Sequence, residues 1–184
     1  MLSTFKNNFF GGTRSNRFEI FGNIPSPTGQ SNGGAFTKFH VRSTIIPQMS
    51  TKTLSYDYFG RKYHYPGEKD YGNWAFTVID DTGLSNNMWR MFQRWHNGIN
   101  NHSTNESFLL GNGKDYKAYD WQIRHLDFNG ENTLKVFKLH GCWPAAVQQM
   151  SLNMLQPNTM NSFNVIILYD YIEIDGITSR TTQG

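Results

Sequence analysis

The stretch that decides the fold is Leu84 to Ile99, LSNNMWRMFQRWHNGI. Its large apolar residues recur every three or four positions, which is the spacing of one face of an α-helix. These residues are Leu84, Met88, Met91, Phe92, Trp95 and Ile99. Asp80 and Asp81 precede the stretch, where carboxylates can accept hydrogen bonds from the first backbone amides of a helix. We therefore expect an amphipathic helix that ends at Gly98.

Most of the remaining sequence has the pattern of short strands and turns. The expected strands are 17–24, 35–43, 73–79, 121–128 and 133–139, with Asn129-Gly130 as a hairpin signal between the last two. Lys38, His40 and Arg42 share one face of the second strand, a pattern typical of a solvated or paired face rather than a phosphate site. A single amphipathic helix among strands needs a sheet against which to bury its apolar side. The helix and a sheet are therefore expected to form the core together.

Two features are expected toward the C-terminus. Pro144 should end the strand before it, because proline cannot donate a ladder hydrogen bond, and the alternation of Met150, Leu152 and Met154 predicts a short strand. The range 162–174 should form the longest strand. Its centre, 165–168, is apolar on both faces, so one side should meet the core and the other the helix or a neighbouring subunit.

Composition and charge narrow the class of protein. A chain of 184 residues fits one domain with its own core, and a net charge of +3 is too small to indicate a nucleic-acid binder by itself. The single cysteine, Cys142, excludes an intramolecular disulfide and fits a reducing compartment. No apolar run resembles a signal peptide or is long enough to cross a bilayer. We expect a soluble protein made in a cytoplasm, without membrane insertion.

The segment TKTLSYDYFGRKYHYPG predicts a long hairpin from Thr51 to Tyr65 that turns at Phe59-Gly60. Aromatic residues alternate with cations along it. This composition suits a projecting hairpin that contacts another protein, and the candidate contact residues are Tyr56, Tyr58, Phe59, Arg61 and Tyr63. The same composition is found in modules that bind single-stranded nucleic acid by stacking. The small net charge favours the protein contact.

The N-terminal segment 1–16 is polar and rich in glycine and asparagine, yet it carries Phe5, Phe9 and Phe10. It is either a frayed terminus or an arm whose Phe9 and Phe10 dock on a neighbouring subunit. The sequence leaves both interpretations open.

The residues that could carry chemistry show no catalytic pattern. His140 and Cys142 lie two apart on an expected strand, hence on one face, but a buried cysteine is commoner there than a nucleophile with its base. The histidines lack zinc spacing, and the glycines before Lys114 lack the rest of a phosphate loop. We expect no catalytic, metal-binding or cofactor-binding residues, and no enzyme activity.

In order and spacing, the chain resembles the tail-tube proteins of contractile-tailed bacteriophages. The resemblance covers roughly 17–174 and is carried by Ile45-Ile46-Pro47, the hairpin, GNWAFTVIDDTG with the tryptophan-bearing helix after it, GCWP, and the final LYDYIEI. It implies a mainly β fold: an antiparallel β-barrel or sandwich with one flanking helix and a projecting hairpin. The implied domain is 17–175, between an arm at 1–16 and a tail at 176–184.

The resemblance also implies a function and partners. Such proteins form homo-hexameric rings that stack into a tube, with strands of neighbouring subunits joined laterally. The residues expected at the lateral contact are Val165, Ile167, Tyr169 and Tyr171, and those at the ring-to-ring contact are the candidate residues of the hairpin. Expected partners are the tail sheath, baseplate and tube-terminator proteins, with tape-measure protein and DNA passing through the lumen without specific binding.

The implied location is the virion tail, assembled in the cytoplasm of the bacterial host. The loops 25–34 and 100–113 and both termini depart from the family pattern. A secreted tube protein of the type VI kind, or a tube initiator or terminator, therefore remains an alternative.

Overall fold

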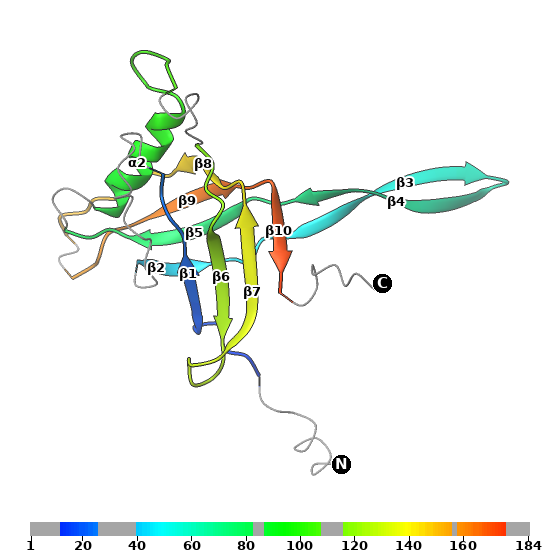
Figure 1. Cartoon of the computed structure of the whole chain (residues 1–184), viewed down its shortest axis with the longest axis horizontal. Coiled ribbons are helices and arrows are strands. Elements are labelled where there is room, and N and C mark those ends of the chain that lie inside the picture. The colour runs from blue at the N-terminus through cyan, green and yellow to red at the C-terminus, as the bar shows by residue number, and fades with distance from the viewer. Residues whose placement is uncertain (1–11, 26–39, 83–86, 108–115, 156–157, 176–184) are drawn as a thin grey trace, which may run out of the picture.

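The computed structural model describes residues 12–25, 40–82, 87–107, 116–155 and 158–175 (Figure 1). Its strands form two four-stranded antiparallel sheets and a hairpin. The first sheet, here the β6–β7 sheet, has the order β1 (Phe18–Phe21), β6 (Trp121–Leu126), β7 (Thr133–His140) and β10 (Tyr171–Ile174). The second, the β5–β9 sheet, has the order β2 (Val41–Thr44), β5 (Trp74–Ile79), β9 (Ser162–Leu168) and β8 (Trp143–Val147). The expected mainly β fold with a flanking helix and a hairpin is confirmed, and the described residues contain one helix.

The hairpin consists of β3 (Met49–Tyr58) and β4 (Arg61–Tyr71) and projects far from the two sheets (Figure 1). It is longer than the expected 51–65, because Pro66 pairs with Thr53 and the ladder continues beyond it through an irregularity at Gly67-Glu68, opposite Lys52. The Gly72 amide donates to the Gln48 carbonyl at 2.9 Å, between this ladder and the pairing of β2 with β5. The hairpin therefore prolongs two strands of the β5–β9 sheet.

The helix α2 spans Met88–Ile99, and the expected residues at 83–86 lie outside the described part of the chain. Asn87 caps its start by accepting from the Arg90 amide at 2.9 Å, while Asp80 accepts a longer bond of 3.4 Å from the Trp89 amide. The expected stop at Gly98 is wrong, because the helix continues through this buried glycine to Ile99. The buried face carries Met88, Met91, Phe92, Trp95 and Gly98, so the amphipathic prediction is confirmed.

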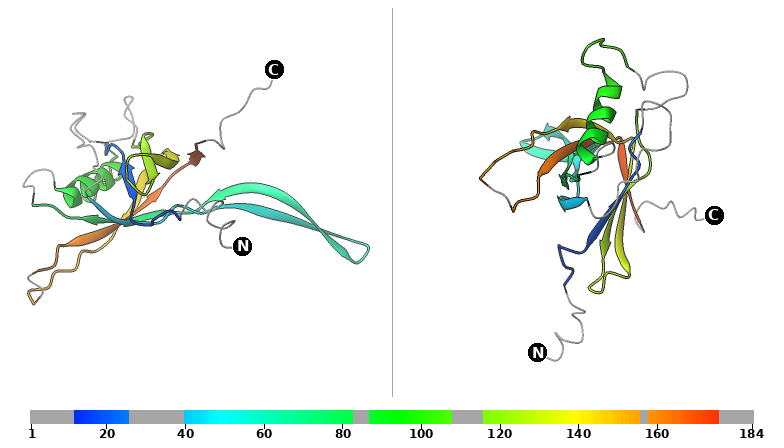
Figure 2. Two further views of the ribbon diagram at one scale, coloured as in Figure 1. Left: turned by 90° about the horizontal axis from the view of Figure 1, so that it is seen from below. Right: turned by 90° about the vertical axis from the view of Figure 1, so that its left-hand side faces the viewer.

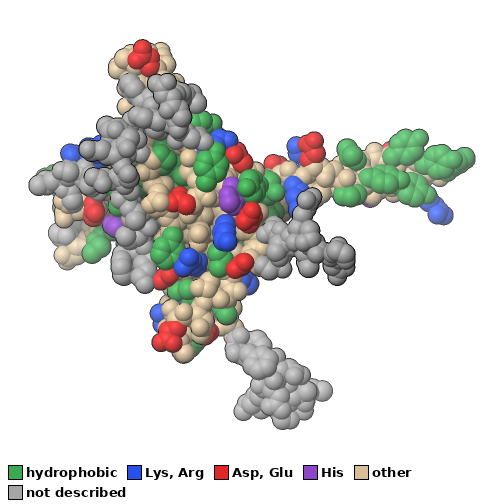
Figure 3. All heavy atoms as spheres, in the orientation of Figure 1, with side chains coloured by type: hydrophobic (Ala, Val, Ile, Leu, Met, Phe, Trp, Pro, Cys, Tyr) green, Lys and Arg blue, Asp and Glu red, His purple; other side chains and the backbone are tan. Residues whose placement is uncertain are grey.

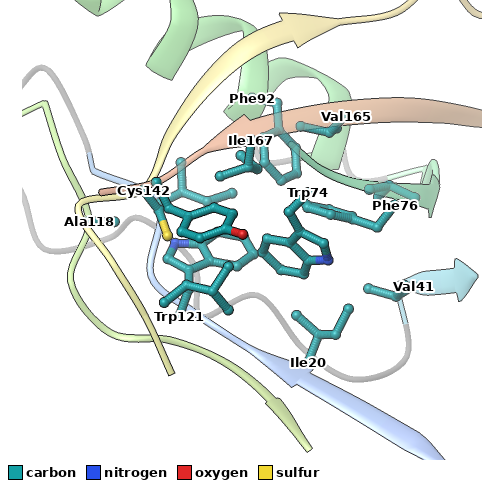
Figure 4. Close-up of a cluster of buried hydrophobic side chains, with 14 of the residues drawn as sticks. Ile20, Val41, Trp74, Phe76, Phe92, Ala118, Trp121, Cys142, Val165 and Ile167 are labelled. Atoms are coloured by element: carbon teal, nitrogen blue, oxygen red, sulfur yellow. The ribbon is translucent and has the colours of Figure 1, made fainter. Parts of the chain in front are cut away.

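Trp121 lies at the centre of an aromatic core (Figure 4). Its ring lies 5.6 Å from that of Trp74 and 6.1 Å from that of Trp95, where it is stacked. The indole N–H of Trp121 donates to the Asn23 carbonyl at 3.1 Å, and that of Trp95 to the Tyr116 carbonyl at 2.8 Å. Because each polar edge is satisfied, these rings can be buried without an orphaned donor.

Helix α2 and the β6–β7 sheet both lie on one face of the β5–β9 sheet (Figure 2). Phe92 of the helix contacts Phe76 and Phe163 of the β5–β9 sheet at ring distances of 6.0 and 6.2 Å. Trp121 of the other sheet contacts Phe76 from the same side at 5.9 Å. The β5–β9 sheet is thus a base layer, and both helix α2 and the β6–β7 sheet pack against its inner face.

Two strand predictions near the C-terminus are wrong. Pro144 lies inside β8 rather than ending a strand, which is possible because β8 is the outer strand of its sheet and a missing donor can face away from β9. The alternation at Met150, Leu152 and Met154 forms no strand, and the Met154 side chain is fully exposed. Here Met150 packs against the core, while Leu152 and Met154 are exposed, so the apolar alternation does not reflect a half-buried strand.

The range 162–174 is also not one strand. It divides at Tyr169-Asp170 into β9 and β10, which belong to different sheets, and the longest strand among the described residues is instead β4 with 11 residues. The expected turn at Asn129-Gly130 exists within the connection between β6 and β7, where Gly130 has φ +79°. No helix in the described part of the chain is long and apolar enough to cross a bilayer.

Candidate subunit interfaces

The hairpin turns through only two residues, Phe59 and Gly60. Both have positive φ, +48° and +71°, as a tight turn matching the twist of two antiparallel strands requires. Glycine adopts this conformation readily, whereas phenylalanine rarely does. The Phe59 side chain is 87% exposed at the tip. The turn therefore places the large apolar ring of Phe59 at the tip of the hairpin.

The register of the hairpin separates its side chains onto two faces. Tyr58 pairs with Arg61, Tyr56 with Tyr63 and Leu54 with Tyr65, and these alternate pairs share one face. We call this surface the aromatic face and define it as Leu54, Tyr56, Tyr58, Phe59, Tyr63 and Tyr65. Its strand residues are between 45% and 63% exposed. Figure 3 shows hydrophobic side chains gathered along the projecting hairpin.

Four of the five predicted contact residues of the hairpin belong to the aromatic face, and the fifth, Arg61, pairs with Tyr58 on the same side of the ribbon. The rings of Tyr56 and Tyr58 lie 6.4 Å apart, and the Tyr58 ring meets the edge of Phe59 at 4.5 Å. Leu54 and Tyr65 belong to the same face but were absent from the predicted set. Counting in steps of two from the Phe59-Gly60 turn would have found both, because strand side chains alternate between faces.

The opposite face of the hairpin is polar. Its pairs are Asp57 with Lys62 and Ser55 with His64. Lys62 and His64 therefore point away from the aromatic rings, whereas Arg61 lies on the same side as the rings. A nucleic-acid strand that stacks on the tyrosines could reach Arg61 but not Lys62, so this face offers a single cation rather than the basic groove of a stacking module.

The aromatic face has little to cover it within this chain. Every residue of β3 is exposed, and a two-stranded ribbon standing alone in water is marginally stable. An apolar surface of this continuity on a soluble protein is typical of a contact with another protein. Tyrosine in particular is favoured at the energetic centres of such contacts.

The residues predicted for the lateral contact lie in two different environments. Val165 and Ile167 are completely buried in this chain's own core, and β9 is paired with β5 on one side and β8 on the other. Tyr169 is also buried, and its ring lies 6.0 Å from that of Tyr71. Only Tyr171, on the outer strand β10, is exposed. Thus β9 offers no unpaired edge, whereas β10 does.

Each four-stranded sheet ends in two outer strands. These are β1 and β10 in the β6–β7 sheet, and β2 and β8 in the β5–β9 sheet. Outer strands present backbone donors and acceptors that a second chain can pair with. Both sheets therefore have the geometry that edge-to-edge pairing needs. Phe9, Phe10 and the loop 25–34 lie almost wholly outside the described residues.

The polar face of α2 forms a separate surface. Arg90, Gln93, Arg94 and Asn97 line a shallow depression of about 440 Å³ together with Trp89, Asn101, His102 and Ser103. No carboxylate belongs to this lining. The depression is open and wide, so it is suited to contact with a surface rather than to enclosing a small molecule.

His140 and Cys142 do not form a catalytic pair. Gly141 between them has φ +71°, which breaks the strand, so the shared face predicted by two-residue spacing is wrong. Cys142 is buried against the core, while the His140 ring stacks on Tyr171 at 4.5 Å, with its Nε2 3.5 Å from the Glu173 carboxylate. Burial raises the pKa of the Cys142 thiol, which keeps it in the unreactive protonated form. Among the described residues, no group of three histidine, cysteine or acidic side chains could hold a metal ion.

The sequence of this chain is similar to sequences of known proteins. A family model described as phage tail tube protein matches residues 13–174. The "Tail tube protein gp19" of Enterobacteria phage T4 is 24% identical over 144 residues, which is 77% of this chain and 83% of that protein.

Solved structures show the same fold. The tube-terminating cap of the anti-feeding prophage aligns with a TM-score of 0.64 at 15% identity, covering 90% of this chain and 92% of that chain. The sheath-tube complex of an extracellular contractile injection system, in its extended state, aligns with a TM-score of 0.62 at 16% identity, covering 95% of this chain and 97% of that chain.

Proposed function

The chain belongs to the phage tail tube protein family, and from this premise we propose that it is a tube subunit whose hexameric rings stack into a conduit for DNA. The family consists of structural proteins of contractile tails rather than enzymes. In this proposal the tube lies inside a contractile sheath in the virion tail and is assembled in the cytoplasm of the bacterial host. Its further partners are the baseplate and terminator proteins, and tape-measure protein and DNA pass through without specific binding.

The observation that carries the proposal is the aromatic face of the hairpin. It is a continuous apolar surface that prolongs the β5–β9 sheet along its strands and is exposed in the single chain. Ring-to-ring stacking by this hairpin would bury Tyr56, Tyr58 and Tyr63 together with Phe59 at the tip. Burial of such side chains is favourable by about 25 cal/mol per Å² of apolar area, and aromatic residues often dominate protein contacts.

Lateral contact within a ring is proposed to use the outer strands. Tyr171 on β10 remains a proposed contact residue, since it is exposed at an edge. Val165, Ile167 and Tyr169 would act indirectly, by holding the core against which β10 and the β5–β9 sheet are positioned. Phe9 and Phe10 stay proposed arm contacts.

The alternatives differ in what they assemble. A type VI-like secreted tube protein would also form stacked rings, whereas an initiator or terminator would add to a tube end without growing. The similarity to a terminating cap extends to the fold only. Tube growth by the purified protein distinguishes a body subunit from an end cap.

Two neighbouring substitutions test the hairpin. Tyr56→Asp places a charge on the aromatic face, and Ser55→Asp places the same charge one residue away on the polar face. Both sites are exposed, so both variants should fold like the wild-type protein. In negative-stain electron microscopy of concentrated protein, with baseplate seeds if needed, we expect tubes from wild type and Ser55→Asp and none from Tyr56→Asp.

The pair gives a clear negative result as well. Equal tube growth by both variants would exclude the aromatic face from stacking. Growth by neither would indicate that any charge on the hairpin is harmful, whichever face carries it. Failure of the seeded wild-type protein to elongate would instead favour the end-cap alternative.

A further inference from the structure

The connection between β8 and β9, residues 148–161, exposes several large apolar side chains. We call it the β8–β9 loop. Leu152, Met154, Leu155 and Met160 are between 76% and 100% exposed. The sequence of the loop, QQMSLNMLQPNTMN, contains no charged residue. Apolar side chains gathered on the surface in this way are typical of a contact with another protein, because they gain nothing from the folding of their own chain.

The described part of the loop is held by the sheet and by its own hydrogen bonds. At its start the Gln148 amide donates to the Asn164 carbonyl at 2.8 Å, and the Met150 side chain packs against the core. Further along, the Asn153 side-chain oxygen accepts from the Leu155 amide at 2.9 Å, which makes a local turn. The exposed side chains at this turn are therefore presented by a supported backbone.

The β8–β9 loop and the hairpin lie at opposite ends of the β5–β9 sheet. Strand β5 starts at Trp74, shortly after the hairpin, and ends at Ile79. Ile79 pairs with Ser162, the first residue after the loop. Figure 1 and the left view of Figure 2 agree with this register, because the hairpin and the loop extend from the molecule in opposite directions. Each end of the sheet thus carries an exposed apolar surface.

An open-ended stack of identical rings needs two different contact surfaces on each subunit. A surface that pairs with its own copy across a twofold axis closes on itself and stops at a pair. A surface that fits a different surface of the next copy can repeat without limit. The aromatic face of the hairpin therefore needs an acceptor elsewhere on the chain, toward the end opposite the hairpin.

The chemistry of the β8–β9 loop suits aromatic rings. Methionine is flexible and polarisable, so it adapts to an irregular surface, and its sulfur makes favourable contacts with aromatic rings. The aromatic face supplies the exposed rings of Tyr56, Tyr58 and Tyr63. Docking would remove apolar side chains of both partners from water without burying a charged group of the loop.

We propose that the β8–β9 loop is the acceptor for the aromatic face of the hairpin of a second copy of this chain, in the adjacent ring. The proposal rests on the tube function proposed above, and it names the partner surface of the hairpin. Each ring then donates its hairpins at one end and receives those of its neighbour at the other. Leu152, Met154, Leu155 and Met160 become buried only when two rings are stacked.

Two substitutions at one position test the acceptor. Met154→Asp places a charge on the loop, and Met154→Leu keeps an apolar side chain of similar size. Because the Met154 side chain is fully exposed, both variants should fold like the wild-type protein. In seeded growth followed by negative-stain electron microscopy, we expect tubes from wild type and Met154→Leu and none from Met154→Asp. Undiminished growth by Met154→Asp would overturn the proposal.

A photochemical cross-link identifies the contact directly. A benzophenone side chain in place of that of Tyr63 keeps an aromatic group on the aromatic face. Tubes grown from a mixture of unlabelled and heavy-isotope-labelled copies are irradiated, and the cross-linked peptides are sequenced by mass spectrometry. We expect pairs of mixed isotope that join this position to the β8–β9 loop, and none from the unassembled protein. Cross-links to α2 or to a second hairpin would overturn the proposal.

The two proposals fail in different ways. If seeded wild-type protein forms no tubes, the proposed tube function fails. If wild-type tubes form and the benzophenone is cross-linked outside the β8–β9 loop, only the assignment of the acceptor is wrong. The cross-link also decides the matter if Met154→Asp does not fold, because it requires no change in the loop.

Discussion

At the scale of single residues, Phe59 combines two unfavourable properties. Its backbone is in the left-handed region at φ +48°, and its ring is 87% exposed to water. Neither property helps this chain to fold, because Asn or Gly would fit the turn better and an exposed ring gains nothing from burial. A residue that is costly in the single chain is expected to gain its benefit in an assembly.

The substitution Phe59→Asn tests whether Phe59 destabilises the single chain and favours the assembly. Asn tolerates the left-handed conformation, so the substitution should stabilise the hairpin by about 1 kcal/mol, measured by slower hydrogen exchange of its amides. It should also raise the protein concentration needed for tube growth, since the tip ring is lost. Phe59→Tyr is the control that keeps the ring and should assemble normally. Unimpaired assembly by Phe59→Asn would show that the tip does not contribute.

Two buried groups give the fold a sensitivity to alkaline pH. Burial raises the pKa of the Cys142 thiol above its ordinary 9.0, and raises the pKa of Tyr169 from 10.0 to about 12. The folded protein keeps both protons at a pH where the unfolded chain releases them. These two groups therefore leave the free energy of unfolding nearly unchanged below pH 9.0 and lower it as the pH rises beyond their ordinary pKa values, by up to about 1.4 kcal/mol per pH unit for each group.

Denaturant unfolding across this pH range measures the effect. Cys142→Ala removes the thiol and should leave a decline that begins only near the ordinary tyrosine pKa of 10.0. An identical decline in the variant and the wild-type protein would assign the sensitivity to other groups. A thiol reagent should react with Cys142 only upon unfolding.

At the scale of elements, the sequence predicted those features whose pattern is local. The amphipathic period of α2, the alternation of Trp74, Phe76 and Val78 in β5, and the turn at Phe59-Gly60 each follow from spacing alone. The candidate contact residues of the hairpin were found in the same way. The sequence did not show the register of the hairpin, which places the tyrosines with Arg61 on one face and Lys62 on the other. The notable feature of the sequence was its composition.

The predictions that were wrong concern features that depend on neighbours distant in sequence. Pro144 is compatible with β8 only because that strand is at the outside of its sheet. The division of 162–174 at Asp170 depends on β9 and β10 finding partners in different sheets. An apolar run therefore predicted burial at Val165 and Ile167 correctly, but it could not distinguish this chain's core from a neighbouring subunit.

The contact of α2 with the core gives a prediction for this element. Trp95→Ala removes a ring that stacks on Trp121 and a donor to the Tyr116 carbonyl, so it should lower the free energy of unfolding by about 3–5 kcal/mol. Arg94→Ala, one residue away on the exposed side, should change it by less than about 0.5 kcal/mol. Denaturant titration measures both. Similar losses would contradict the packing of the helix through one face.

At the scale of the whole molecule, apolar and charged surfaces are separated. One face of the hairpin presents aromatic rings, and the strands of the β5–β9 sheet contain a single charged residue, Arg42. Assembly through the hairpin should then behave as apolar association and not as pairing of charges. Sodium chloride screens charge pairs but does not weaken apolar contacts, while ammonium sulfate strengthens them and cooling weakens them.

We therefore expect the protein concentration needed for tube growth to change little between low and high sodium chloride. Ammonium sulfate should lower it, and cooling should raise it, as measured by light scattering of seeded growth. Tyr56→Asp separates the hairpin from other contacts, because it should remain unassembled in every condition. A steep rise in the required concentration with sodium chloride would instead indicate that ion pairs drive assembly, and that the aromatic face of the hairpin is secondary to the charged surfaces of α2 and the β6–β7 sheet.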